Sequence, residues 1–144
     1  MKIRELTHGE ERSWAVVFAT GDDPMAGLLD FARRQNLSAA HLSAIGAFER
    51  ATLGFFDMER NEYHRIPVEE QAEVVSLTGN VTLKPDGSAN LHVHAVLGRR
   101  DGQAVAGHLL EARVRPTLEV MVTETPAHLQ RRHDPATGLD LLAG

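Results

Sequence analysis

Apolar and polar residues alternate along most of this chain, which is the period that places one face of a strand in a core. The alternating segments are short and separated by turn residues, so the pattern predicts a mostly antiparallel sheet. The ranges that we predict as strands are 14–19, 38–46, 51–57, 62–66, 73–83, 91–98, 103–114 and 117–124, with 139–142 as a further edge strand. A bulge or bend is expected at Gly79 and a break at Pro116. The aromatic residues of the 51–66 hairpin are expected to be packed.

One segment has the period of a helix. Asp23 and Pro24 are typical of an N-cap and a first helical position. The apolar residues that follow recur at the spacing of one helix face: Met25, Leu28, Leu29 and Ala32. With Asn36 as a left-handed terminator, the pattern predicts one main helix at about 24–36. One helix and six to eight strands indicate an α+β fold, formed as a single compact domain over residues 1–144.

The composition limits the size of the fold, the kinds of metal ligand and the compartments that are compatible with this chain. The chain has 144 residues, 42% of them apolar, which suffices for one domain with a sizeable core. It contains no cysteine, so disulfides and thiolate-ligated metals are excluded. The N-terminus lacks the apolar core of a signal peptide, and no apolar run approaches the roughly 18 residues of a membrane span. We therefore expect a soluble, cytoplasmic protein without a membrane partner.

Histidines supply the strongest chemical signal. His92 and His94 lie two residues apart in the predicted strand 91–98, so both point to one side with Cα atoms about 6.5 Å apart. A turn at 99–102 would bring the returning strand, and with it His108, back to them. Three neutral imidazoles with one open position form the ligand set of a Zn²⁺ site that keeps a water. The alternative is that the pair is half-buried and hydrogen-bonded to its neighbours.

Catalysis at such a metal would also need a general base. Glu119 is the best-placed acidic candidate from the strand pattern, with Glu111 behind it. Either residue could instead orient a histidine or pair across the sheet. His41 and Ser43 share a strand face, but no acidic partner follows at a recognisable spacing, so a hydrogen-bonded core pair is the expected role. Whether His41, His64 or a neighbouring subunit adds a metal ligand stays open.

Several segments together resemble the plants-and-prokaryotes conserved (PPC) domain family over nearly the whole chain. They are residues 45–48, 51–57, 73–80, 91–94, 107–111 and 116–120. The resemblance implies an α+β fold with a major antiparallel sheet and a homotrimeric assembly. In plants the domain follows AT-hook segments that bind AT-rich DNA, whereas prokaryotic members stand alone and are commonly labelled predicted DNA-binding proteins. Those relatives look like metal binders through the positions of His92, His94 and His108.

Direct DNA binding by this chain is disfavoured, because it lacks the Arg-Gly-Arg-Pro core of an AT-hook and carries a net charge of −5. Two hypotheses follow. The first is a trimeric, regulatory or DNA-associated binding module with a three-histidine zinc site and an undetermined small-molecule or protein partner. The second is a zinc-dependent hydrolase or lyase that acts on a small molecule through an activated water. A deep pocket with an unpaired carboxylate would favour the enzyme.

Overall fold

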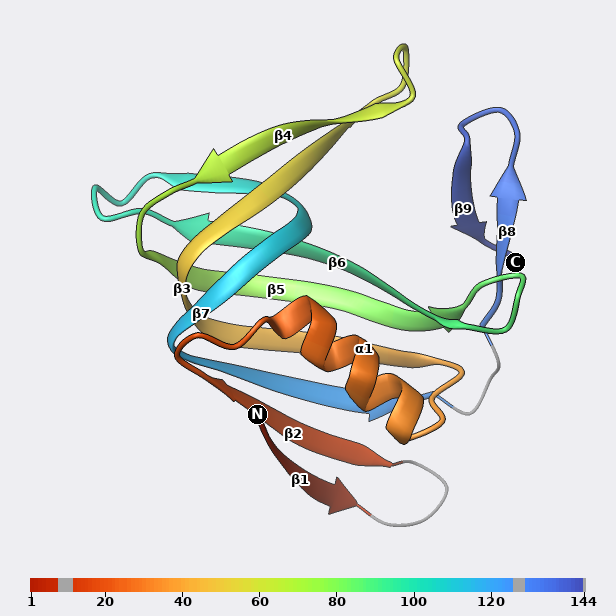
Figure 1. Ribbon diagram of the computed structural model, residues 1–144, viewed down its shortest axis with the longest axis horizontal. Helices are drawn as coiled ribbons and strands as arrows, with labels where there is room; N and C mark the ends of the chain where they lie inside the picture. The colour runs from red at the N-terminus through yellow and green to blue at the C-terminus, as the bar shows by residue number, and fades with distance from the viewer. Residues whose placement is uncertain (8–11, 126–128, 144) are drawn as a thin grey trace.

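The computed structural model describes residues 1–7, 12–125 and 129–143 and confirms the α+β class. Within these ranges the chain forms one helix and nine strands (Figure 1). In chain order they are β1 (Lys2–Thr7), β2 (Ser13–Ala19), α1 (Pro24–Arg34), β3 (Ala40–Asp57), β4 (Glu62–Val68), β5 (Ala72–Leu83), β6 (Ala89–Gly98), β7 (Ala104–Glu124), β8 (Arg131–Asp134) and β9 (Leu139–Leu142). No helix in the described ranges is long and apolar enough to cross a membrane.

Seven strands build one antiparallel sheet in the order β1-β2-β7-β6-β5-β3-β4. The two longest strands, β3 and β7, also pair with each other along most of their length. Strand β3 also changes its second neighbour along its length: its first half pairs with β5, and its second half pairs with β4. The sheet curls as a result, and the β3–β4 hairpin extends away from α1 (Figure 1). Strands β8 and β9 form a separate hairpin.

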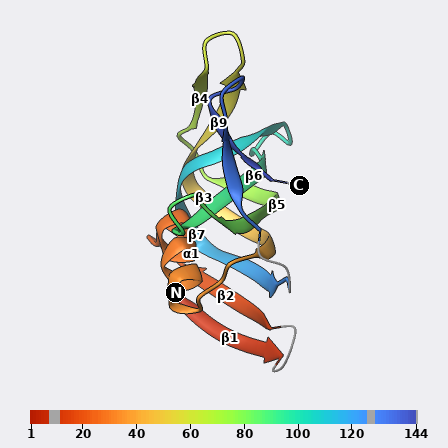
Figure 2. The same cartoon turned by 90° about the vertical axis from the view of Figure 1, so that its right-hand side faces the viewer.

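Helix α1 covers one face of the sheet (Figure 2). As expected, the Asp23 side chain caps the helix by accepting a hydrogen bond from the Ala26 N–H, and Asn36 adopts a left-handed φ of 54° after its end. Phe31 of α1 packs edge-on against Trp14 of β2, with ring centroids 5.5 Å apart. Val93 of β6 is buried on this face, so its neighbours along β6 point to the opposite, open face.

Two predicted interruptions are wrong, because the β3–β7 ladder shifts its register there and the two strands continue. Pro116 lies inside β7, between Val114, which pairs with Phe48, and Leu118, which pairs with Gly46. The register shifts between those pairs, so the missing N–H of the proline breaks no ladder bond. For the same reason β3 continues through Gly46 instead of ending there.

The bulge expected at Gly79 is also displaced. The irregularity of the β5–β6 ladder lies between Val74 and Ser76, and Gly79 pairs regularly with Val93. A Cβ atom at position 79 would lie 2.3 Å from the carbonyl oxygen of His92. Glycine is needed here because β5 approaches the backbone of the histidine strand closely.

Other expectations need smaller corrections. His41 and Ser43 are exposed on the open face and do not form a core pair, because their strand neighbours take the buried side. Phe55 was expected to be packed, yet 66% of it is exposed on the β3–β4 hairpin. For residues 67–71 the sequence predicts a connector or a single helical turn; in the structure residues 67–68 extend β4, and residues 69–71 are the connector. The sequence also predicts a polar turn at residues 7–11, of which residues 8–11, like His128, fall outside the described residues.

Candidate metal centre

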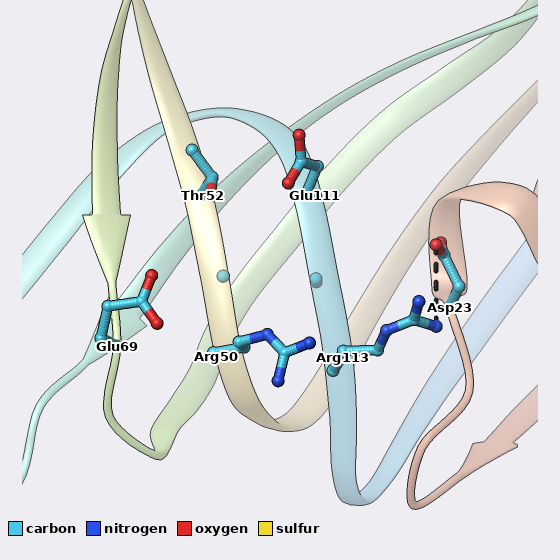
Figure 3. Close-up of a pocket in the computed structure, with 8 residues that line it drawn as sticks. Asp23, Arg50, Thr52, Glu69, Glu111 and Arg113 are labelled. Atoms are coloured by element: carbon cyan, nitrogen blue, oxygen red, sulfur yellow. Dashed lines mark ion pairs between the residues drawn. The ribbon is translucent and has the colours of Figure 1, made fainter.

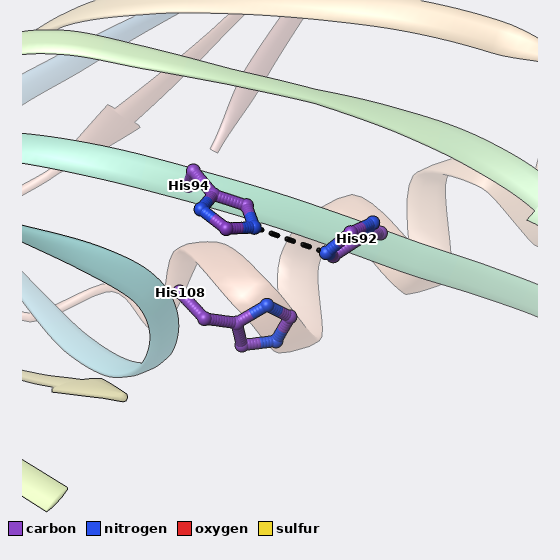
Figure 4. A group of neighbouring side chains, drawn as sticks. All are labelled: His92, His94 and His108. Atoms are coloured by element: carbon purple, nitrogen blue, oxygen red, sulfur yellow. Dashed lines mark hydrogen bonds between the residues drawn. The ribbon is translucent and has the colours of Figure 1, made fainter. Parts of the chain in front are cut away.

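Three histidine rings converge on the open face, as Figure 4 shows. His92 and His94 come from β6, and the β6–β7 register places His108 directly opposite His94. The ring centroids form a nearly regular triangle with sides of 4.9, 5.0 and 5.3 Å. One nitrogen from each ring lies within 4.8 Å of the other two. In the described part of the chain this is the one such group of three, and it contains no carboxylate.

The spacing of the nitrogens suits a tetrahedral ion. Nε2 of His94 lies 3.1 Å from Nε2 of His92. Two imidazole ligands at 2.0–2.1 Å from a tetrahedral Zn²⁺ ion are separated by about 3.3 Å, so the two rings are already close to a ligating arrangement. Three histidine ligands would leave one position of such an ion for water or another ligand, and His94 is the exposed member of the group.

Burial favours the uncharged form of two of the three rings, those of His92 and His108. Desolvation lowers the pKa of His108 to about 4, and the neighbouring His92, His94 and Arg131 add smaller effects in the same direction. The pKa of His92 is also lowered, first by burial and then by Arg131 and His94. Nδ1 of His108 is buried without a hydrogen-bond partner among the described residues. Neutral imidazoles are the form that binds a metal, so an ion would displace few protons at neutral pH.

The ring of Tyr63 on β4 packs against the ring of His108. The two ring centroids lie 5.1 Å apart, and the ring planes are tilted by 34°. Strand β3 runs between them, and a Cβ atom at Gly54, the residue paired with His108, would lie 2.8 Å from Cδ1 of Tyr63. The glycine therefore gives the tyrosine room to cross β3 and pack on the histidine.

Arg131 of β8 holds the other side of the site. Its side chain is 7% exposed and donates hydrogen bonds to Thr82 Oγ1, to Asn80 Oδ1 and to the carbonyl oxygen of Asp140. Its Nη2 also lies 3.1 Å from Nδ1 of His92. A guanidinium only donates, so this Nδ1 accepts and Nε2 carries the ring proton. For Nε2 of His92 to bind an ion, the ring proton would have to move to Nδ1, and the contact with Arg131 would have to open.

The two glutamates that the sequence offers as general bases do not lie beside the three histidines. Glu119 faces Ile45 across the β3–β7 ladder and lines a different hollow. Glu111 is paired with Arg65 at 2.6 Å. His41 and His64 are exposed and do not belong to the histidine group. The sequence pattern also missed Tyr63 and Arg131, since both reach the site through the order of the strands and no local spacing marks them.

The lowered pKa values predict acid sensitivity of the metal-free protein. An unfolded histidine has a pKa near 6.5, so between pH 6.5 and 4 the unfolded chain binds more protons than the folded one. The stabilisation is complete above pH 6.5 and is lost as the pH falls toward 4. After discounting for partial exposure, we expect His108 to account for about 1–2 kcal/mol. Urea unfolding across this range should show a smaller pH dependence for His108→Gln than for wild type; equal slopes would contradict the prediction.

The sequence matches the family described as the Plants and Prokaryotes Conserved (PCC) domain over residues 6–126. This is the PPC family that the sequence segments resemble. No curated protein matches it. Among solved structures the chain is similar to a metal-containing protein from Archaeoglobus fulgidus, with 32% identity and a TM-score of 0.84. That similarity covers 100% of this chain and 99% of the other. The match is therefore end to end.

Two further structures give the same result. A plant- and prokaryote-conserved protein from Pyrococcus horikoshii has 27% identity and a TM-score of 0.86, covering 99% of this chain and 95% of that one. A candidate DNA-binding protein from Bacteroides thetaiotaomicron has 26% identity and a TM-score of 0.86, covering 98% and 96%. An α-acetolactate decarboxylase from Bacillus subtilis, at 9% identity and a TM-score of 0.58 over 88% of this chain and 58% of that one, shares the fold alone.

Proposed function

The chain belongs to the Plants and Prokaryotes Conserved domain family, and from this premise we propose that it is a homotrimeric binding module of regulatory type with a zinc site. His92, His94 and His108 would hold the ion. The observation that carries the proposal is the convergence of three imidazoles with ligating nitrogens 3.1 Å apart in the closest pair. The metal-containing relative of 32% identity supports it.

The donor set favours zinc over the hard cations. Mg²⁺ and Ca²⁺ prefer oxygen ligands, and the group contains no carboxylate in the described residues. Imidazole suits Zn²⁺ and its borderline neighbours in the first transition row. A three-histidine site leaves one coordination position for water or for a small ligand with an anionic donor atom.

A zinc-dependent hydrolase or lyase is the second candidate, favoured by that open position. A cavity of about 210 Å³ lies beside the histidines, below the usual 300–1,000 Å³ of small-molecule sites. The one carboxylate that lines it, Asp140, lies 3.4 Å from Nδ1 of His133. Both side chains of this contact are largely exposed, and it is the small volume of the cavity that supports the binding module over the enzyme.

Regulation through a partner fits this chain better than direct contact with DNA. Relatives are described as candidate DNA-binding proteins, but this sequence has a net charge of −5. Phosphate neutralisation by basic residues supplies most non-specific DNA affinity. A protein or small-molecule partner is accordingly the better proposal.

The homotrimer implied by the family resemblance has support from the surface. Ile45, Val75 and Met121 are 61%, 60% and 47% exposed, and they line one hollow on the open face. Clustered exposed apolar side chains are typical of interaction surfaces. The chain also has 8421 Å² of accessible surface, against about 7,300 Å² for a compact monomer of its mass. Burial of this apolar surface between copies would account for both features.

Metal content tests the zinc site. We expect about one zinc per chain in untagged wild-type protein and none in the His92→Ala/His94→Ala double variant, because one remaining imidazole cannot hold the ion. Elemental analysis after extensive dialysis measures this directly. His64→Ala is the matched control and should keep the metal, since His64 is exposed and outside the group. A wild-type chain that stays metal-free after growth and dialysis with zinc would sink the proposal.

A further inference from the structure

Two arginines face each other at the base of the β3–β4 hairpin, away from the histidines. Arg50 of β3 pairs directly with Arg113 of β7 in the antiparallel ladder. Like charges placed directly opposite on one face of a sheet are destabilising. Within the described residues Arg50 forms no ion pair, and Arg113 has a long one of 3.9 Å to Asp23. The ladder therefore holds a repulsive pair that no side chain nearby neutralises fully.

A cavity of about 330 Å³ opens beside this pair, as Figure 3 shows. This volume falls within the range of small-molecule sites. Ala51 and Ala112 pair with each other beside the arginines and point to the opposite, buried face, so their backbone forms the floor of the cavity. The polar side chains that line the cavity are Asp23, Arg50, Thr52, Glu69, Glu111 and Arg113.

The acidic residues of the cavity have other roles or lie to one side. Glu111 is held by Arg65 at 2.6 Å. The Asp23 side chain caps α1. Glu69 lies beyond Arg50 as seen from Arg113 (Figure 3). These carboxylates flank the arginine pair, so they would repel an extended polyanion such as nucleic acid while leaving room for one compact anionic group.

We propose that this arginine-lined cavity binds a small metabolite through a carboxylate or phosphate group that bridges Arg50 and Arg113. The planar guanidinium groups match both oxyanions, and an anion between them removes the like-charge repulsion. Thr52, opposite Glu111 in the ladder, adds a hydroxyl donor at the upper end of the cavity. The site is separate from the histidine group and includes none of its residues.

Calorimetric titration of the full chain with inorganic phosphate and with succinate, at constant ionic strength, tests the site. We expect saturable binding of at least one probe to wild type, and the stronger probe identifies the anionic group. Arg50→Gln should weaken that binding at least tenfold, since it removes one of two charged donors. It should also leave the melting temperature of the ligand-free protein equal or higher, because the repulsion is relieved. Arg33→Gln, an equal charge change on the exposed side of α1, should bind as wild type does.

A repeat on His94→Ala separates this site from a metal that captures the anion, and binding should be retained there. The proposal is overturned if neither probe binds wild type saturably up to 10 mM, roughly the millimolar limit of a weak specific site. It is also overturned if Arg50→Gln and Arg33→Gln bind equally, or if His94→Ala abolishes binding.

Discussion

Zinc raises the melting temperature of the wild-type chain and leaves that of His94→Ala unchanged; this is the result we expect of a three-histidine site. A ligand that binds only the folded state, present at 100 times its dissociation constant, adds about 2.7 kcal/mol of stability. For a domain of this length that corresponds to roughly 8 °C. Differential scanning calorimetry at pH 7, with and without zinc in excess over the protein, measures this shift in melting temperature. A chelator should reverse the shift.

His94 is the ligand to change because it is the exposed member of the group. His92 contacts Arg131 and His108 packs against Tyr63, so their removal would disturb the fold as well as the metal. The zinc-free melting temperature of His94→Ala should therefore match that of wild type, and His64→Ala should respond to zinc as wild type does. A zinc response of equal size in His94→Ala would show that the ion binds elsewhere.

The centre of the site was predictable because it rests on local rules. The two-residue period of a strand places His92 and His94 on one side, and the turn at 99–102 sets the register that brings in His108. Gly102 adopts the left-handed φ of 83° that such a turn requires. The supporting residues were not predictable from spacing, because β4 and β8 reach the site only through the strand order of the folded sheet.

The two wrong strand interruptions have one physical origin. Pro116 and Gly46 interrupt a local pattern, and a local reading ends the strand at each of them. In the fold both lie where the β3–β7 ladder shifts its register, so each strand continues although the regular pairing is interrupted there. The same long strands explain why the sheet has an open face: α1 is too short to cover a sheet whose strands reach 18 and 21 residues.

The open face links the metal site to the proposed subunit contact. Cross-strand pairs run in one row from Met121 through Ser43 and Thr78 to His94. Residues directly opposite in a ladder point to the same side, so the exposed apolar cluster and the histidines share one surface. A second copy of the chain that covers Met121 would therefore lie on the same surface as His94, three strand spacings or about 14 Å away along this row.

Charge on this surface should separate the subunits. Val75→Glu/Met121→Glu places two carboxylates where the proposed contact buries apolar side chains, and burial of an unpaired charge costs several kcal/mol. We expect at least a 100-fold weaker association, or about 2.7 kcal/mol. Light scattering after size exclusion should give three times the chain mass of 15.8 kDa for wild type and the single chain mass for the variant. Leu142→Glu, an exposed apolar position of β9 outside this hollow, is the control and should remain trimeric. A monomeric wild type, or a variant of unchanged mass, would contradict the proposed contact.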